Sequence, residues 1–188
     1  SCETALAEAE VEYEEKKSQS VYVKFQVTRD TARKLEIPEN ASILIWTTTP
    51  WTLPANVAIA LKPAALYVLL EVGEHRVIVA MDLVPRLKST LNWNDPKIIK
   101  TFQGSQFEKL TCLHPFMNRE YLLILGEHVT LDTGTGCVHT APGHGQEDYV
   151  IGLEYQLPIL SPVDERGLFT DEVPLVQKQF VFKANLSI

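Results

Sequence analysis

The sequence lacks the features that mark membrane-spanning, secreted or disulfide-stapled proteins. No apolar run approaches about 20 residues, the length that a membrane-spanning helix needs. The first residues, Ser-Cys-Glu-Thr followed by acidic residues, do not match a signal peptide, and none is expected. There are only three cysteines, Cys2, Cys112 and Cys137, and this odd, scattered set favours a reduced protein of the cytoplasm.

Positive charge is also scarce, which limits the ways in which the chain can bind nucleic acid. Lysine and arginine number 17 against 24 aspartates and glutamates, which gives a net charge of −7. A protein that holds nucleic acid through its phosphates is expected to be basic. The chain therefore binds no nucleic acid, binds only a small end of one, or relies on a basic partner domain.

Motifs of several enzyme classes are missing as well. The sequence contains no Walker motif, no Gly-x-Ser-x-Gly nucleophile elbow and no complete Gly-x-Gly-x-x-Gly fingerprint. Its length of 188 residues, with 45% hydrophobic and 22% charged residues, is typical of a single soluble globular domain.

What the sequence does contain is a series of short apolar or alternating runs, separated by turn signals. The runs that predict strands are Val21–Thr28, Ser42–Trp46, Val57–Leu61, Leu66–Val72, Arg76–Ala80, Lys97–Phe102, Leu110–His114, Tyr121–Leu125 and Phe180–Ala184. Met81–Leu91 and Gln146–Gln156 predict helices, whereas the polar Arg29–Asn40 predicts a loop. The apolar residues with helical spacing around the second helix are Tyr149, Val150, Leu153 and Leu157. Together these elements predict an α+β, β-rich fold with a β-barrel-like core and a few flanking helices.

A first candidate site is the run Thr-Thr-Thr-Pro-Trp-Thr-Leu-Pro-Ala-Asn at residues 47–56. It follows a predicted strand, so its hydroxyl and backbone groups are expected on a rim, where such groups bind a ribose or a carbonyl. Trp51 offers a ring on which a base can stack. The alternative is an ordinary β-branched strand end with a proline turn, and a tryptophan of the core or rim.

A second candidate is the glycine-rich run at residues 134–149, which predicts a strand, a turn and the start of a helix. His139, His144 and Asp148 lie at or near the seam between them. With Cys137 they form a possible set of metal ligands, but their spacing matches no zinc pattern. The other readings are hydrogen-bonded structural histidines, and an Asp148 that favours the helix dipole, binds an ammonium group or orients a water.

Taken together, the two stretches resemble the editing domain of isoleucyl-tRNA synthetase, a class I enzyme. The family patterns Trp-Thr-Thr-Thr-Pro-Trp-Thr-Leu-Pro-Ala-Asn and Gly-Thr-Gly-x-Val-His-Thr-Ala-Pro-Gly-His-Gly stand at residues 46–56 and 134–145. The resemblance continues through Pro158–Asp164 and ends at Lys183-Ala184-Asn185. One departure is Glu147-Asp148, where the family has two aspartates; the second acidic residue is the one that the family uses.

The resemblance implies a β-barrel-rich domain inserted in a Rossmann catalytic core. Residues 1–188 then form a single editing domain, with residues 1–20 and 180–188 as connecting arms to the absent core. The implied activity is hydrolysis of the ester in mischarged Val-tRNA(Ile) by water, as proofreading in translation. A second, hydrolytic site is needed because a binding pocket rejects a substrate that lacks one methylene only weakly.

The resemblance also implies roles for individual residues. The implied substrate-binding residues are Thr47, Thr48, Thr49, Trp51, Asn56, His139 and Asp148. Among them the implied catalytic set is Asp148, which holds the substrate α-ammonium group, His139, which limits pocket size, and Thr48 of the threonine wall. Asn56 is implied as a supporting polar group. Water is the expected nucleophile, without a metal or a covalent intermediate; the base stays open, and the ribose hydroxyl of the substrate is one candidate.

The signatures of the synthetic site, His-x-Gly-His and Lys-Met-Ser-Lys-Ser, do not occur in these residues. No cofactor is therefore expected, since ATP and Mg²⁺ would belong to the absent catalytic core. The expected partners are the 3′ terminal aminoacyl-adenosine of tRNA(Ile), valine as product and the rest of the synthetase chain, with no membrane. A cytoplasmic monomer is expected. The alternatives are a docking module that catalyses nothing in isolation, and a metal-dependent hydrolase.

Overall fold

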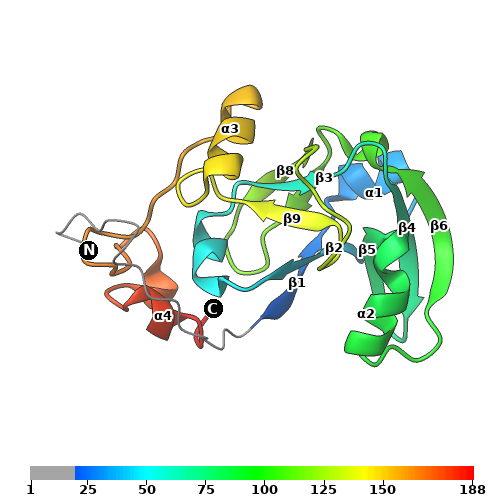
Figure 1. Ribbon diagram of the computed structural model, residues 1–188, viewed down its shortest axis with the longest axis horizontal. Helices are drawn as coiled ribbons and strands as arrows, with labels where there is room; N and C mark the ends of the chain where they lie inside the picture. The colour runs from blue at the N-terminus through cyan, green and yellow to red at the C-terminus, as the bar shows by residue number, and fades with distance from the viewer. Residues whose placement is uncertain (1–19) are drawn as a thin grey trace, which may run out of the picture.

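A computed structural model describes residues 20–188, which form two β-sheets flanked by short helices (Figure 1). The acidic arm predicted at residues 1–20 lies, except for its last residue, outside the described residues. One sheet is five-stranded with the order β1-β2-β5-β4-β6, and the other is four-stranded with the order β7-β8-β3-β9. Neither strand order closes on itself, so the described core is a pair of open sheets rather than a closed barrel. The α+β, β-rich class is confirmed.

The first sheet is built from the longer apolar runs of the chain. Its strands are β1 (Val21–Gln26), β2 (Ala41–Thr47), β4 (Leu66–Val72), β5 (His75–Ala80) and β6 (Lys97–Gln103). β4 and β5 form the predicted hairpin, and Gly73 takes the positive φ of 57° that its tight turn requires. β2 is buried along almost its whole length, because it lies between β1 and β5.

The second sheet carries the glycine-rich stretch beside the strand that follows the threonine run. Its strands are β3 (Ala58–Leu61), β7 (Thr111–Leu113), β8 (Glu120–Leu125) and β9 (Cys137–Thr140). β3 pairs with β8 in parallel and with β9 in antiparallel register, which sets Ile59 opposite His139. One buried core, which includes Ile45 and Ile59, joins the two sheets.

The helices are short and cover the ends and one face of the sheets. They are α1 (Arg29–Leu35), α2 (Val84–Thr90), α3 (Gln146–Glu154) and α4 (Val181–Ala184), with 3₁₀ turns η2 (Pro50–Ala55), η3 (Met81–Leu83), η4 (Gly104–Phe107) and η5 (Pro174–Val176). The helix predicted at Met81–Leu91 corresponds to η3 followed by α2.

Two of the predicted elements are wrong. The predicted loop Arg29–Asn40 contains α1, which begins where the Thr28 hydroxyl accepts a hydrogen bond from the Thr31 amide at 3.3 Å. Thr28 is also the last residue of an alternating pattern that predicts a strand, so it did not stand out as a helix cap. The predicted strand Phe180–Ala184 is mostly α4; only Phe180 pairs, in a single bridge with Leu168.

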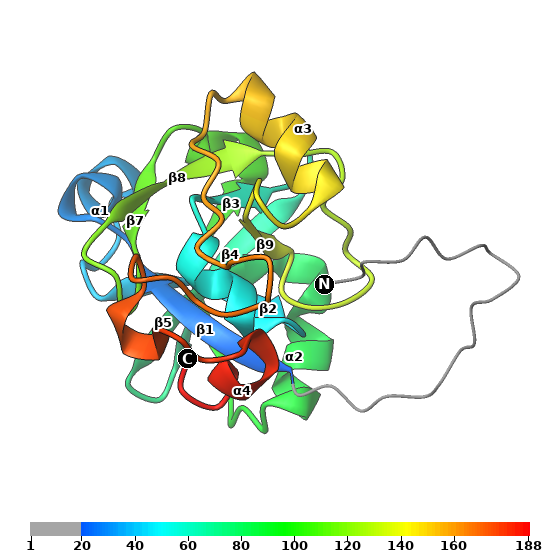
Figure 2. The ribbon, with the colours of Figure 1, turned by 90° about the vertical axis from the view of Figure 1, so that its left-hand side faces the viewer.

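The helix predicted at Gln146–Gln156 is confirmed as α3, but three of the apolar residues used to predict it do not face the core. Tyr149, Val150 and Leu153 are 43%, 63% and 59% exposed. Ile151 and Tyr155 instead pack on the small cluster over the second sheet. Figure 2 shows α3 lying across that sheet near β8.

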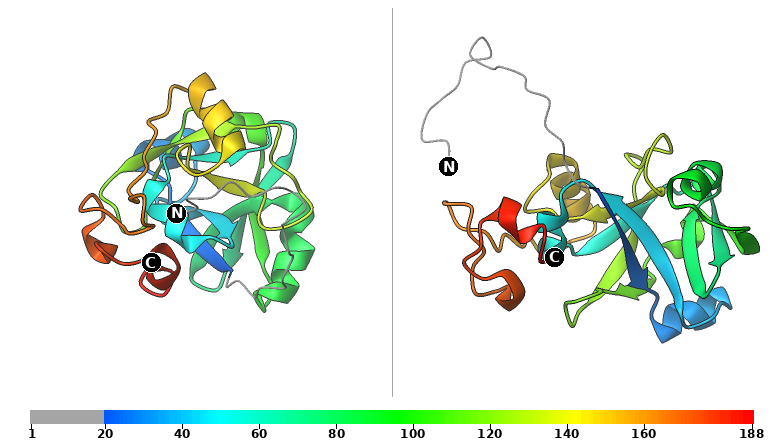
Figure 3. Two further views of the ribbon diagram at one scale, coloured as in Figure 1. Left: turned by 60° about the vertical axis from the view of Figure 1, so that its left-hand side comes forward. Right: turned by 90° about the horizontal axis from the view of Figure 1, so that it is seen from below.

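The C-terminal segment forms a satellite cluster of its own at one end of the molecule. Phe169, Val173, Val176, Val181 and Ala184 are buried in it, with Trp51 and Ile188 packed against them. Figure 3 shows this segment beside η2, at the end of the molecule away from β6 and α2. The C-terminal segment therefore touches the threonine run directly.

His114 anchors η2 from its inner side. Its Nε2 lies 3.1 Å from the Leu53 carbonyl oxygen and so donates to it, while Nδ1 accepts from the backbone amides of Phe116 and Met117. Burial lowers the pKa of His114 to about 4, although the bond to Leu53 acts in the opposite direction. The neutral ring therefore holds η2 against the core.

Candidate functional site

The end of β2 and the middle of β9 meet at one point, although they are far apart in sequence. Thr47 is the last residue of β2, and its Oγ1 lies 3.4 Å from Nε2 of His139. Thr52, in η2, places its Oγ1 3.2 Å from the same nitrogen. The structure therefore brings the threonine run and His139 together into one cluster.

Hydrogen bonds fix the threonine run at the end of β2. Thr47 is buried, and its Oγ1 accepts from the Thr49 amide at 3.1 Å and lies 3.2 Å from the Thr49 hydroxyl. Thr48 and Thr49 are exposed. The result is a rim of hydroxyl and backbone groups that is open to solvent but fixed from below by Thr47.

The hydrogen bonds around His139 indicate which of its nitrogens carries the proton. The single hydroxyl proton of Thr52 is directed to the Thr49 carbonyl oxygen at 2.8 Å, so Thr52 Oγ1 is an acceptor towards His139. Nε2 of His139 is therefore the donor, and Nδ1 is a buried acceptor without a hydrogen-bond partner among residues 20–188. Burial lowers the pKa of His139, against the raising effect of Asp148. The ring is neutral at physiological pH and fixed in orientation.

Asp148 lies in the first turn of α3 and ties that helix to the end of β9. Its Oδ2 accepts a hydrogen bond from the Ala141 amide at 2.8 Å. The intervening turn is closed by the His144 amide, which donates to the Ala141 carbonyl at 2.8 Å. Asp148 is half-buried, and a carboxylate has acceptor positions beyond the one that Ala141 uses. A negative charge is thus held on the same side of the fold as His139.

Asn56 and Trp51 have different surroundings from the threonines. Asn56 is fully buried, and its Oδ1 accepts from the Thr140 amide at 3.0 Å, which joins η2 to β9 from beneath. Its side-chain nitrogen is buried and has no hydrogen-bond partner in the part of the chain that the structure describes. Trp51 is half-buried, with its ring edge-to-face on His144 at 5.1 Å between centroids. Asn56 therefore supports the rim from below, whereas Trp51 borders it.

Two residues of this cluster were not singled out from the sequence. Thr52 was read as part of the motif, yet it is the residue whose hydroxyl lies nearest to His139. Asn185 accepts a hydrogen bond from the Trp51 amide at 2.9 Å. For Thr52 the signal was its position in the turn after the threonine run, and for Asn185 it was its place at the end of the family resemblance.

The residues proposed as metal ligands do not form a common site. Among the described residues, no group of three or more His, Cys, Asp and Glu side chains is placed to hold a metal ion. Cys137 is buried, and burial raises the pKa of its thiol, so the metal-binding thiolate is disfavoured. His144 instead packs on Trp51. Within residues 20–188, no helix has the length and apolar character to span a bilayer.

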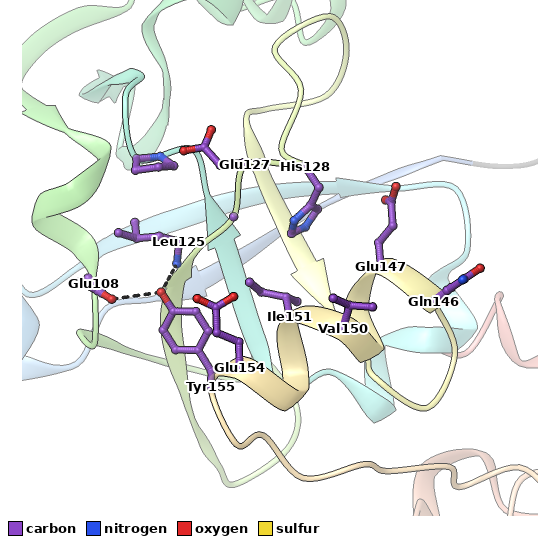
Figure 4. Close-up of a pocket in the computed structure, with 12 residues that line it drawn as sticks. Glu108, Leu125, Glu127, His128, Gln146, Glu147, Val150, Ile151, Glu154 and Tyr155 are labelled. Carbon is purple, nitrogen blue, oxygen red and sulfur yellow. Dashed lines mark hydrogen bonds between the residues drawn. The ribbon is translucent and has the colours of Figure 1, made fainter.

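A separate cavity of about 830 Å³ lies on another side of α3. Figure 4 shows Glu108, Glu127, His128, Glu147 and Tyr155 around it. The threonine run, His139 and Asp148 do not line it. Its carboxylates give it an acidic lining, which distinguishes it from the hydroxyl-rich rim.

Comparisons with known proteins identify the family to which the chain belongs. A family model described as the leucyl-tRNA synthetase editing domain matches residues 16–185. Isoleucine–tRNA ligases from Moorella thermoacetica and Desulforamulus reducens are 56% and 53% identical over 187 and 189 residues, which is 100% of this chain and 20% of each ligase. The chain thus spans about a fifth of the length of these relatives.

Solved structures show the same fold at low sequence identity. The crystal structure of GlLeuRS-CP1 superposes with a TM-score of 0.61 at 16% identity, covering 72% of this chain and 60% of that one. The editing domain of the P. knowlesi cytosolic leucyl-tRNA synthetase gives a TM-score of 0.58 at 13% identity, covering 74% and 65%. With the family model covering most of its length, the chain belongs to the editing domains of class I tRNA synthetases, and its sequence is of the isoleucine–tRNA ligase kind.

Proposed function

We propose that this domain hydrolyses the ester that links valine to the 3′ end of tRNA(Ile), as the proofreading step of an isoleucine–tRNA ligase. The observation that carries the proposal is the cluster at the ends of β2 and β9. There, hydroxyl groups, a neutral imidazole and the nearby carboxylate of Asp148 surround a surface open to solvent. These groups suit a small aminoacyl ester whose one charged group is an ammonium group.

In the proposed reaction, a water oxygen attacks the carbonyl carbon of the aminoacyl ester. The bond from that carbon to the ribose oxygen breaks, and the ribose oxygen takes up one proton of the water. The other proton passes to solvent, and valine leaves with a carboxylate group. Asp148 binds the α-ammonium group by a charge-assisted hydrogen bond. Thr47, Thr48 and Thr49 contact the aminoacyl group and the ribose, with Thr48 nearest to the chemistry, and Trp51 borders the terminal adenosine.

His139 is proposed as the group that limits the size of the amino acid. A neutral ring fixed by Thr47 and Thr52 is better suited to a rigid wall than to a proton carrier, since protonating Nδ1 would place a donor where the described residues offer no acceptor. Valine fits beside such a wall, whereas the additional methylene of isoleucine does not. We assign no protein side chain as the base; the ribose hydroxyl of the substrate or a solvent molecule activates the water.

Two observations support the proposed partners: the net negative charge of the chain, and the fact that it spans about a fifth of the length of the related ligases. The domain is acidic, so it contacts only the terminal aminoacyl-adenosine, and the remainder of the synthetase holds the tRNA body. No cofactor takes part in the proposed hydrolysis. The domain is further proposed to be monomeric and to act in the cytoplasm.

Release of radiolabelled valine from Val-tRNA(Ile) by the 188-residue chain tests the proposed function. Release above the rate in buffer supports it, and unchanged release with EDTA separates it from a metal-dependent hydrolase. Binding of Val-tRNA(Ile) without release would instead support the docking module, an alternative suggested by the acidic charge and the short span. Loss of release after EDTA treatment, restored by a divalent metal, would contradict hydrolysis without a metal.

A further inference from the structure

We propose that Asn185 is a positioning residue of the editing site, which fixes the η2 turn and, through Thr52, the orientation of His139. The part of this proposal that concerns editing rests on the proposed function, whereas the part that concerns the position of η2 does not. Asn185 directly follows α4 and lies 134 residues after Trp51, whose amide donates to Asn185 Oδ1 at 2.9 Å. A residue near the C-terminus of the described chain thus reaches the threonine run.

This contact completes the hydrogen bonding of the first turn of η2. The first amides of a helix have no partner within it and need one from outside. Pro50, the first residue of η2, has no N–H group, and the Thr52 amide donates to the Thr49 carbonyl at 3.0 Å. No side chain of the preceding residue caps the turn. Asn185 therefore supplies, from a distant segment, the acceptor that a local cap supplies in other helices.

The segment that carries Asn185 is held in place by its own small core. Val181 and Ala184 of α4 are buried in the satellite cluster, and Trp51 packs against that cluster. The Ile188 amide donates to the Ala184 carbonyl at 3.0 Å, which continues the turn past Asn185. The cluster therefore fixes α4 and one side of Trp51 together, so that the Asn185 side chain meets the Trp51 amide.

The effect of this contact reaches the His139 ring in two steps, through Trp51 and then Thr52. Thr52 directly follows Trp51 in η2, and its Oγ1 lies 3.2 Å from His139 Nε2. The Trp51 ring also packs edge-to-face on His144, in the turn that leads to Asp148. When the Trp51 amide loses its acceptor, η2 is free to shift, and the hydrogen bond that orients the His139 ring weakens.

The test compares Asn185→Leu, which removes the acceptor at similar size, with Asn185→Asp, which keeps an oxygen acceptor. Leu186→Ala changes the next residue, which is 81% exposed, and serves as the matched control. The first measurement is hydrogen exchange at the Trp51 amide, with the imidazole NMR signals of His139, in the ligand-free protein. We expect exchange about 10-fold faster or more in Asn185→Leu, with changed His139 signals, and values close to wild type in the other two variants.

The second measurement is deacylation of Val-tRNA(Ile) and Ile-tRNA(Ile), with kcat and KM determined separately. We expect Asn185→Leu to lower the ratio of the two kcat/KM values about 3- to 10-fold, the range that loss of one hydrogen bond produces, and Asn185→Asp to restore it. Unchanged Trp51 exchange in Asn185→Leu would overturn the proposal, as would a selectivity ratio equal to wild type. If wild-type protein does not deacylate Val-tRNA(Ile), the proposed function fails, while the exchange and NMR arms still decide the positioning of η2 and His139.

Discussion

The carboxylate of Asp148 holds the end of β9 to α3 and is proposed to bind the substrate as well, and substitution can distinguish the two roles. Its Oδ2 accepts from the Ala141 amide at 2.8 Å, and its charge is proposed to hold the ammonium group of the substrate. Asparagine keeps an oxygen that can accept from Ala141 but carries no charge. Alanine removes both the acceptor and the charge.

The expected magnitudes of the two effects differ enough to be measured apart. A hydrogen bond to a charged group contributes about 1.5–3 kcal/mol, which corresponds to about a 10- to 150-fold loss of kcat/KM. The hydrogen bond from the Ala141 amide also ends on this carboxylate, and with asparagine at position 148 it becomes a neutral hydrogen bond. A neutral hydrogen bond still contributes about 0.5–1.5 kcal/mol, or a few degrees in Tm for a chain of this length. Asp148→Asn should therefore lose most of the activity and little stability, and Asp148→Ala should lose both.

Initial rates of valine release from Val-tRNA(Ile), paired with thermal melts, provide the assay. Glu147→Gln removes the same charge at the neighbouring exposed position, so it controls for the general effect of net charge. It should release valine within about twofold of wild type, since screened surface charges have small effects. Full activity of Asp148→Asn would refute the ammonium role, and loss of activity that merely follows Tm in each variant would refute the separation of roles.

Two further predictions concern the elements that hold the site. Gly152→Ala should be destabilising, because the new Cβ would lie 2.8 Å from Cγ of Pro142; overpacking costs about 1–3 kcal/mol, and better helix propensity offsets only about 1. Denaturant unfolding should show this loss together with slower valine release, while Val150→Ala at an exposed position of α3 should show neither. For His114, burial lowers the pKa from 6.5 to about 4. Between these two pH values the imidazole is protonated in the unfolded chain and neutral in the folded chain. Stability should fall by up to about 3 kcal/mol as pH drops from 6.5 towards 4, and a His114→Gln variant with an equally steep pH dependence would contradict this.

The features that could be predicted from the sequence are those that depend on patterns among neighbouring residues. β2 and the β4–β5 hairpin follow from apolar runs and a Gly-containing turn, and both occur as predicted. α1 was missed because its capping signal, Thr28, belongs equally to the pattern of the preceding strand. Helical spacing predicted α3, but spacing alone does not say which side meets the sheet, so the exposure of Val150 could not be foreseen.

For the candidate site as well, local motifs could be predicted from the sequence, whereas contacts between distant segments could not. The threonine run and the His139 stretch were recognised from their motifs, yet their meeting depends on the pairing of β3 with β9 and the packing of that sheet against β2. The roles proposed for Thr52 and Asn185 depend on contacts with residues that lie 87 and 134 positions away in the sequence, respectively. No periodicity or motif encodes contacts of that range, so they emerge only from the three-dimensional structure.

The measurement that tests the central claim most directly compares amino-acid release from Val-tRNA(Ile) and from Ile-tRNA(Ile), by wild-type protein and by His139→Ala. Exclusion of one methylene is worth about 1–3 kcal/mol, so wild type should release valine about 10- to 200-fold faster than isoleucine. Removing the fixed imidazole should leave valine release within about tenfold of wild type and raise isoleucine release towards it. Equal rates on the two substrates in wild type, or no gain of isoleucine release in His139→Ala, would contradict a size-selective editing site bounded by His139.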